Sequence, residues 1–187
     1  MNLILSLVTA HFLADFAFQP QWLANAKKNR WWGVPLHALI HFIAMAVLLI
    51  PFLNWPSVWG AMALVALTHW GIDYGKIVLG ERSPMHPLLM YLADQLLHFI
   101  ILLIASTYFF NSLVAELDYS PHWFFTDPSI FSYLFLLTLA TYALDMTRWT
   151  YRISQNPDTP SYRRDYKTIV RNGLIVTVSF VLYWVLR

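Results

Sequence analysis

Long apolar stretches alternate with short polar segments along this chain of 187 residues. A membrane-spanning helix needs about 20 mostly apolar residues, and roughly 17 to 25 are tolerated. Stretches of that length lie at about residues 2–19, 35–53, 57–79, 87–110, 129–152 and 167–186. Prolines stand near several of their ends, where helices begin or stop. The pattern predicts an all-α, polytopic membrane helical bundle with about six transmembrane helices.

The composition supports a membrane protein. Hydrophobic residues make up 58% of the chain and charged residues only 12%, with a mean hydropathy of +0.51. A soluble domain usually has about 25% charged residues. The net charge of +2 is too small to indicate a nucleic-acid partner, and without cysteine there is no thiolate to bind a metal. We therefore expect a single integral membrane domain over residues 1–187, surrounded by the lipid bilayer.

The basic residues predict the orientation of the bundle. Lysines and arginines gather in the segments 20–34, 76–86 and 148–171, whereas the alternate connections 54–56 and 111–128 have none. Basic segments stay on the cytoplasmic side of a membrane, so both termini are expected outside. Lys27, Lys28 and Arg30 are interpreted in this way, as determinants of topology. The first stretch lacks the basic start and cleavage site of a signal peptide, so we expect a retained helix.

Pairs of His and Asp residues interrupt the first four apolar stretches. The two members of each pair are four positions apart, which places both side chains on one face of a helix. The predicted metal ligands are His11, Asp15, His37, His41, His69, Asp73, Asp94 and His98. Ionisable side chains inside a membrane are costly, so they turn inward and find partners. In the predicted topology, all of them lie roughly 5 to 18 Å from the same membrane face, at about 1.5 Å per residue. They can therefore share one centre.

Imidazoles and carboxylates together are typical ligands of zinc, with manganese and iron as alternatives. Five histidines and three aspartates exceed the needs of one four-coordinate ion. We therefore expect one or two divalent ions, with zinc first, and some groups that act in catalysis. His11 is a candidate ligand or general base, and Lys76 is a candidate catalytic residue that steadies a phosphate. Gln19 and Gln95 are candidates for orienting the bound cofactor or the substrate.

An ordered set of motifs carries a resemblance to a known family. The motifs are H-F-L-A-D-F-x-x-Q at 11–19, K-K at 27–28, H-A-L-I-H at 37–41, T-H-W-G-I-D-Y-G-K at 68–76 and D-Q-L-L-H at 94–98. Over about residues 1–110, the chain resembles a bacterial multi-pass membrane family known as domain of unknown function 3307. The resemblance implies a bacterial cytoplasmic (inner) membrane and supports a shared site on helices 2–110. It assigns no reaction, and it leaves the role of helices 129–186 open.

Our first hypothesis is a metal-dependent hydrolase of the phosphoesterase type, embedded in the membrane. It would act on a lipid or lipid-linked phosphoester at the cytoplasmic face, because two-metal sites suit phosphoester hydrolysis. Its helical H-x-x-x-D pairs also resemble those of zinc-dependent phospholipase C, an analogy at the level of the fold.

Two alternatives stay open at this point. One is a transporter of divalent metal or protons, because intramembrane His and Asp mark such pathways. The other is a structural membrane subunit, in which the polar cluster only holds the bundle together. Gly71 and Gly75 form a small-residue pattern that suits close helix packing or a homodimer contact.

Overall fold

The computed structural model describes residues 3–82, 86–114 and 127–186, and within these ranges it contains helices and no strands. The longer helices are α1 (Leu3–Phe12), α2 (Gln21–Asn29), α3 (Gly33–Leu48), α4 (Pro56–Arg82), α5 (Pro87–Val114), α7 (Pro128–Thr138), α8 (Leu144–Gln155) and α9 (Tyr166–Leu186). Two π-helical turns, η1 (Leu13–Ala17) and η3 (Leu139–Ala143), and a 3-10 turn, η2 (Ile50–Phe52), complete the set. The predicted all-α class is confirmed.

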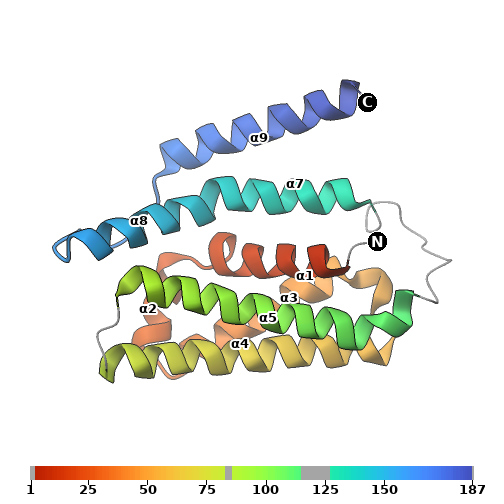
Figure 1. Cartoon of the computed structure of the whole chain (residues 1–187), viewed down its shortest axis with the longest axis horizontal. Coiled ribbons are helices and arrows are strands. Elements are labelled where there is room, and N and C mark those ends of the chain that lie inside the picture. The colour runs from red at the N-terminus through yellow and green to blue at the C-terminus, as the bar shows by residue number, and fades with distance from the viewer. Residues whose placement is uncertain (1–2, 83–85, 115–126, 187) are drawn as a thin grey trace.

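The helices form an elongated bundle (Figure 1). α4 packs against α3 and α5, while α1 contacts α3, α5 and α7. α7, η3 and α8 form one nearly continuous helix, and α9 lies at the edge of the bundle against α7 and η3 (Figure 1). The two termini lie near the same end of the bundle, whereas α2 and the end of α8 lie at the other (Figure 1). The basic segments on and around α2 and α8 therefore share one end, as the predicted topology requires.

Three helices are long and apolar enough to cross a membrane: Pro87–Tyr108, Pro128–Gln155 and Tyr166–Leu186. The length and composition of these helices are those of a membrane protein. Two shorter apolar segments, Ile4–Ala17 and Gly33–Leu48, coincide with two further predicted spans. The remaining predicted span lies within α4, which has 27 residues. Six crossings thus stay a prediction, although a helix lies at each of the six positions.

The apolar core fills the half of the bundle farther from α2. It combines side chains from the first part of α1, the end of α3, the start of α4 and the later part of α5, and α7 closes it with Phe131. Its fully buried members include Leu7, Ala10, Met45, Val58, Met62, Leu102 and Ala105. Burial of this apolar surface holds the helices together. The polar residues of the same helices are thereby fixed in the other half.

The segment between the first two apolar stretches contains a helix, α2, where the sequence analysis expected only a basic loop. Leu23 and Ala26 are buried because α2 packs against α3. Gly33 begins α3, and a Cβ added there would collide with the backbone of Ala26. Its φ is not positive, so a close approach of α2 to α3, and not backbone strain, requires the glycine.

Candidate metal centre

All of the predicted His and Asp side chains meet between α1, η1, α3, α4 and α5. The residues are His11 on α1, Asp15 on η1, His37 and His41 on α3, His69 and Asp73 on α4, and Asp94 and His98 on α5. Seven of the eight are buried, and the side chain of the other, Asp15, is only 11% exposed. The four helix faces predicted from the spacing therefore converge. The role of these side chains as metal ligands stays a prediction.

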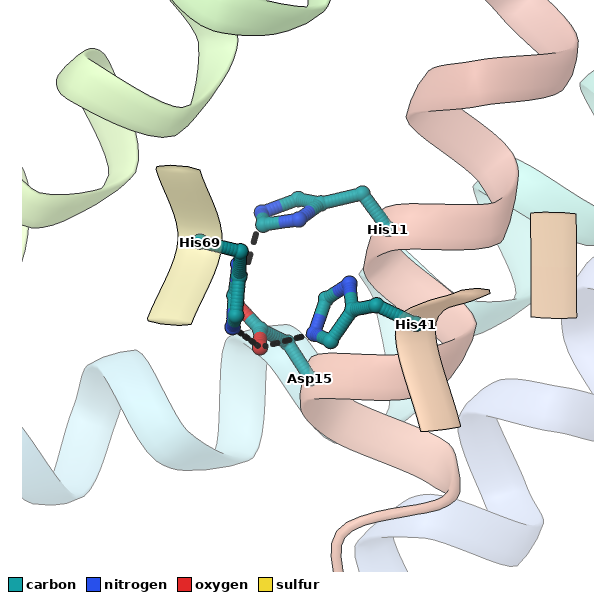
Figure 2. Close-up of side chains that lie close together, drawn as sticks. All are labelled: His11, Asp15, His41 and His69. Atoms are coloured by element: carbon teal, nitrogen blue, oxygen red, sulfur yellow. Dashed lines mark hydrogen bonds and ion pairs between the residues drawn. The ribbon is translucent and has the colours of Figure 1, made fainter. Parts of the chain in front are cut away.

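The carboxylate of Asp15 lies at the middle of the histidines. Its Oδ1 is 2.9 Å from Nε2 of His37 and 3.0 Å from Nε2 of His41. Nε2 of His69 lies 3.7 Å from the same oxygen, and Nε2 of His11 lies 3.3 Å from Oδ2. Figure 2 shows the rings of His11, His41 and His69 gathered around this carboxylate. One acidic group thus contacts imidazoles from three helices.

The turn that carries Asp15 is π-helical. The backbone N–H of Phe18 donates to the carbonyl of Leu13, five residues back, over 2.7 Å. Such turns are rare and are often found at functional sites. The spacing of four predicts an ordinary α-helical face here, yet His11 and Asp15 still face each other across the wider turn.

Arg164 holds the end of this π-helical turn. Its Nη2 donates to the carbonyls of Phe16 and Gln19, over 2.9 Å each, and its guanidinium lies over the ring of Tyr142. Carbonyls at a helix end have no partner within the helix. A residue of the last third of the chain therefore supports the backbone at Phe16, next to Asp15, and at Gln19. No sequence motif pointed to Arg164, because the contact joins segments far apart in the chain.

The side chains form three overlapping groups, and in each group the donor atoms lie within 4.8 Å of one another. The groups are His11/Asp15/His41/His69, His37/His69/Asp73 and Asp73/Asp94/His98. Ligands about 2.1 Å from a tetrahedral zinc ion lie about 3.4 Å apart. The N···O separations of 2.9 to 3.7 Å around Asp15 bracket that value. Because neighbouring groups share His69 or Asp73, the geometry suits more than one ion.

Several buried imidazoles lack hydrogen-bond partners among the described residues. Both ring nitrogens of His11, His69 and His98 are in this state. Buried polar atoms of native proteins are almost always paired. The nearby carboxylate oxygens do not meet hydrogen-bond geometry, although His11 and His69 each lie within 3.4 Å of one. These nitrogens are therefore well suited to bind a cation.

Two lysines flank the cluster. Nζ of Lys76 lies 2.7 Å from Oδ2 of Asp94, so this predicted catalytic residue does reach the centre. Nζ of Lys27 lies 2.5 Å from Oδ2 of Asp73 and donates to the side chain of Gln19 over 3.0 Å. The basic segment around Lys27 predicts only a role in membrane topology for this residue. Its place in the K-K motif was the available signal, but the packing of α2 was needed to use it.

The two predicted glutamines also reach the centre. The amide nitrogen of Gln95 lies 3.4 Å from Oδ2 of Asp15 and 3.4 Å from Oδ2 of Asp94. The side chain of Gln19 donates to the backbone carbonyl of Asp15 over 3.2 Å. Gln95 can therefore orient two carboxylates of the cluster, and Gln19 can support the backbone that carries Asp15.

A cavity of about 390 Å³ lies beside the cluster. Its polar side includes Asp15, Asp73 and Asp94, together with Lys27, Lys76, Gln19 and Gln95. Its other side includes Met146, Trp149 and Ile153 of α8, together with Tyr162. Helices whose role the sequence left open thus form a wall of this cavity.

Tyr162 is fixed by the segment that links α8 to α9. Its hydroxyl donates to Oδ2 of Asp145 over 2.8 Å. Burial, together with this hydrogen bond and the negative charge of Asp145, raises the pKa of Tyr162 above its usual value. Tyr162 thus reaches the cavity as a neutral hydrogen-bonded group.

Gly71 and Gly75 face open space. A Cβ added at either position would meet no atom within 4 Å. They therefore do not mediate packing between helices in the part of the chain that the structure describes. The homodimer contact stays a prediction.

These features define an all-α membrane protein with a buried His and Asp centre beside an amphipathic cavity. Residues 3–126 match the family described as "Protein of unknown function (DUF3307)", and because the match covers more than half of the chain, the protein belongs to that family. The matched range contains the eight His and Asp residues, while Arg164 and the α8 wall lie outside it. Neither a curated protein nor a solved structure matches the chain.

Proposed function

We propose that this protein is a metal-dependent hydrolase that cleaves a lipid or lipid-linked phosphoester at the cytoplasmic face of a bacterial inner membrane. The observation that carries the proposal is the surplus of imidazoles and carboxylates beside a cavity that also contains two ammonium groups. A purely structural cluster would not need three overlapping groups of possible ligands.

The three overlapping groups would hold one or two divalent ions, with zinc the first choice for a mixed set of imidazoles and carboxylates. Such ions supply a nucleophile at neutral pH by lowering the pKa of water, and they neutralise charge on phosphate oxygens. Asp15 and Asp73 are the best-placed carboxylate ligands, because each lies close to more than one histidine.

The charges of the centre favour an anionic substrate once a cation is bound. With neutral imidazoles, three carboxylates and two ammonium groups leave a net charge of −1. One divalent ion makes this +1, which attracts a phosphate. Lys27 and Lys76 line the cavity, so their ammonium groups can hold phosphate oxygens.

In the proposed reaction, the oxygen of a water molecule forms a bond to phosphorus, and the bond between phosphorus and the leaving oxygen breaks. His11 accepts a proton from the attacking water, as a general base. The leaving oxygen takes a proton from solvent in the cavity, so that an alcohol and a phosphate product result. Gln95 keeps the carboxylates of Asp15 and Asp94 oriented during these steps.

The alternative of a metal or proton transporter has less support. A path across the membrane needs polar groups along its full length. The half of the bundle farther from α2 is filled by the apolar core, from Leu7 on α1 to Leu102 on α5. Measuring zinc and proton flux into proteoliposomes tests this alternative directly, and flux that is lost with Asp15→Asn would favour it.

Metal analysis of the purified full-length protein is the first test of the hydrolase. We expect one to two equivalents of zinc, which Asp15→Asn and His69→Ala reduce to less than a tenth. His86→Ala is the matched control, because His86 is an exposed histidine outside the cluster. The second test is phosphate-ester hydrolysis in vesicles, lost in the same two variants. A folded wild-type protein that binds no divalent metal and hydrolyses no phosphoester would overturn the proposal.

A further inference from the structure

A second, apolar depression lies between α1 and α5 and shares Gln95 with the polar cavity. This groove between α1 and α5 has a volume of about 260 Å³. Its lining residues are Val8, His11, Phe12, Gln95, Leu96, Phe99 and Leu102. All but His11 and Gln95 are apolar, so the groove suits a hydrocarbon group.

The groove leads to the candidate metal centre. Gln95 lines both the groove and the polar cavity. His11 also lines the groove, is only 2% exposed, and has no hydrogen-bond partner at either ring nitrogen within the described part of the chain. A ligand in the groove therefore lies next to His11 and, at Gln95, adjoins the cavity that Lys27 and Lys76 line.

The surface around the groove belongs to a membrane-length helix. Leu92, Leu96, Phe99 and Leu103 are 40 to 58% exposed and follow one face of α5. In a bilayer such a face meets lipid chains, because these apolar side chains carry no polar group that needs a hydrogen-bond partner.

We propose that the groove between α1 and α5 binds an acyl chain of a phospholipid whose phosphate lies in the polar cavity beside Lys27 and Lys76. This inference rests on the proposed function and narrows the class of the natural substrate to a lipid that approaches from within the bilayer. The polar junction of the lipid, where chain and phosphate meet, lies at Gln95.

Leu96→Trp tests the proposal by filling the groove from an exposed position. Leu92→Trp is the matched control, because Leu92 lies one turn away, is similarly exposed and lines neither cavity. Native mass spectrometry of the full-length protein in detergent measures retained phosphatidylglycerol. We expect the wild type and Leu92→Trp to retain one lipid, and Leu96→Trp to retain at least tenfold less. Phe99→Ala, which removes one wall, provides a second variant with the same expectation.

Hydrolysis separates this inference from the proposed function. Leu96→Trp should lower kcat/KM for long-chain phosphatidylglycerol by at least tenfold, and change hydrolysis of the water-soluble bis(4-nitrophenyl) phosphate by less than twofold. If lipid retention depends on Leu96 but no variant hydrolyses either compound, the groove stands and the hydrolase fails. Equal lipid retention in all variants, or none in the wild type, would overturn the groove.

Discussion

Replacing Gly33 by alanine tests how closely α2 must approach α3 to place Lys27. The added Cβ would lie 2.3 Å from the backbone carbonyl of Ala26, the residue before Lys27, whereas ordinary contacts begin at 3.4 Å. The backbone of α2 must therefore retreat by about 1.1 Å, the difference between these two distances. An equal shift would lengthen the 2.5 Å contact between Lys27 and Asp73 to about 3.6 Å, beyond the usual length of a charge-assisted hydrogen bond.

The expected cost follows from the crowding. Overpacking of a close contact costs about 1 to 3 kcal/mol. For a protein of about this length, each kcal/mol lowers the midpoint of thermal unfolding by roughly 2 to 4 °C. We expect Gly33→Ala to lower the midpoint by about 2 to 12 °C.

Thermal unfolding of the purified protein, followed by circular dichroism, measures this change. Gly80→Ala is the matched control, because its Cβ would meet only the side chain of Met90 at 3.8 Å, an ordinary contact. Alanine is the better helix former by about 1 kcal/mol, so the control should unfold at the same temperature as the wild type or slightly higher. If both variants unfold alike, the close approach of α2 to α3 is refuted.

Three further predictions concern the residues around the centre. Lys27→Met removes one charge-assisted contact to phosphate, worth about 1.5 to 3 kcal/mol. KM for a phospholipid in vesicles should therefore rise by at least about tenfold, while the zinc content stays unchanged. An unchanged KM would contradict the proposed role of Lys27. Arg164→Ala removes the hydrogen bonds to the carbonyls of Phe16 and Gln19, so titration of the protein with zinc should show affinity weakened by about tenfold. Arg164→Lys should restore the affinity only in part, because a lysine cannot both bridge the two carbonyls and stack on an aromatic ring. The pKa of Tyr162 is raised in the folded protein, so folding favours the protonated hydroxyl, and stability should fall above about pH 10. Between pH 8 and 11, the midpoint of thermal unfolding should fall less in Tyr162→Phe than in the wild type.

Helical periodicity made the centre predictable, while contacts between distant segments did not leave a sequence signal. A spacing of four places His37 and His41 on one face whatever the surrounding fold, and the cost of burying such groups predicts that these faces meet. The approach of Lys27 to Asp73 depends on how α2 packs, and the contact of Arg164 with Phe16 joins residues 148 positions apart. Neither has a periodic pattern.

The local geometry of the helix that carries Asp15 also could not be predicted from the sequence. Nothing in the sequence of Leu13–Ala17 distinguishes a π-helical turn from an α-helical one, because both suit the same residues. The difference lies in the backbone hydrogen bonding, as in the bond from Phe18 to Leu13, five residues back. The wall formed by Met146 and Trp149 was missed for a related reason. Apolar residues of α8 do not reveal whether they meet lipid or a cavity until their neighbours are placed.

The unequal lengths of the helices have a consequence for the surrounding bilayer. α3 has 16 residues and rises about 24 Å at about 1.5 Å per residue, whereas the hydrocarbon layer is about 30 Å thick. The apolar part of α5, with 22 residues, rises about 33 Å. Where α3 crosses the membrane as predicted, a bilayer that fits α5 must thin by several ångströms beside it, a hydrophobic mismatch. Such thinning would bring lipid headgroups closer to the depth of His37 and would shorten the path of the proposed phosphate to the histidines.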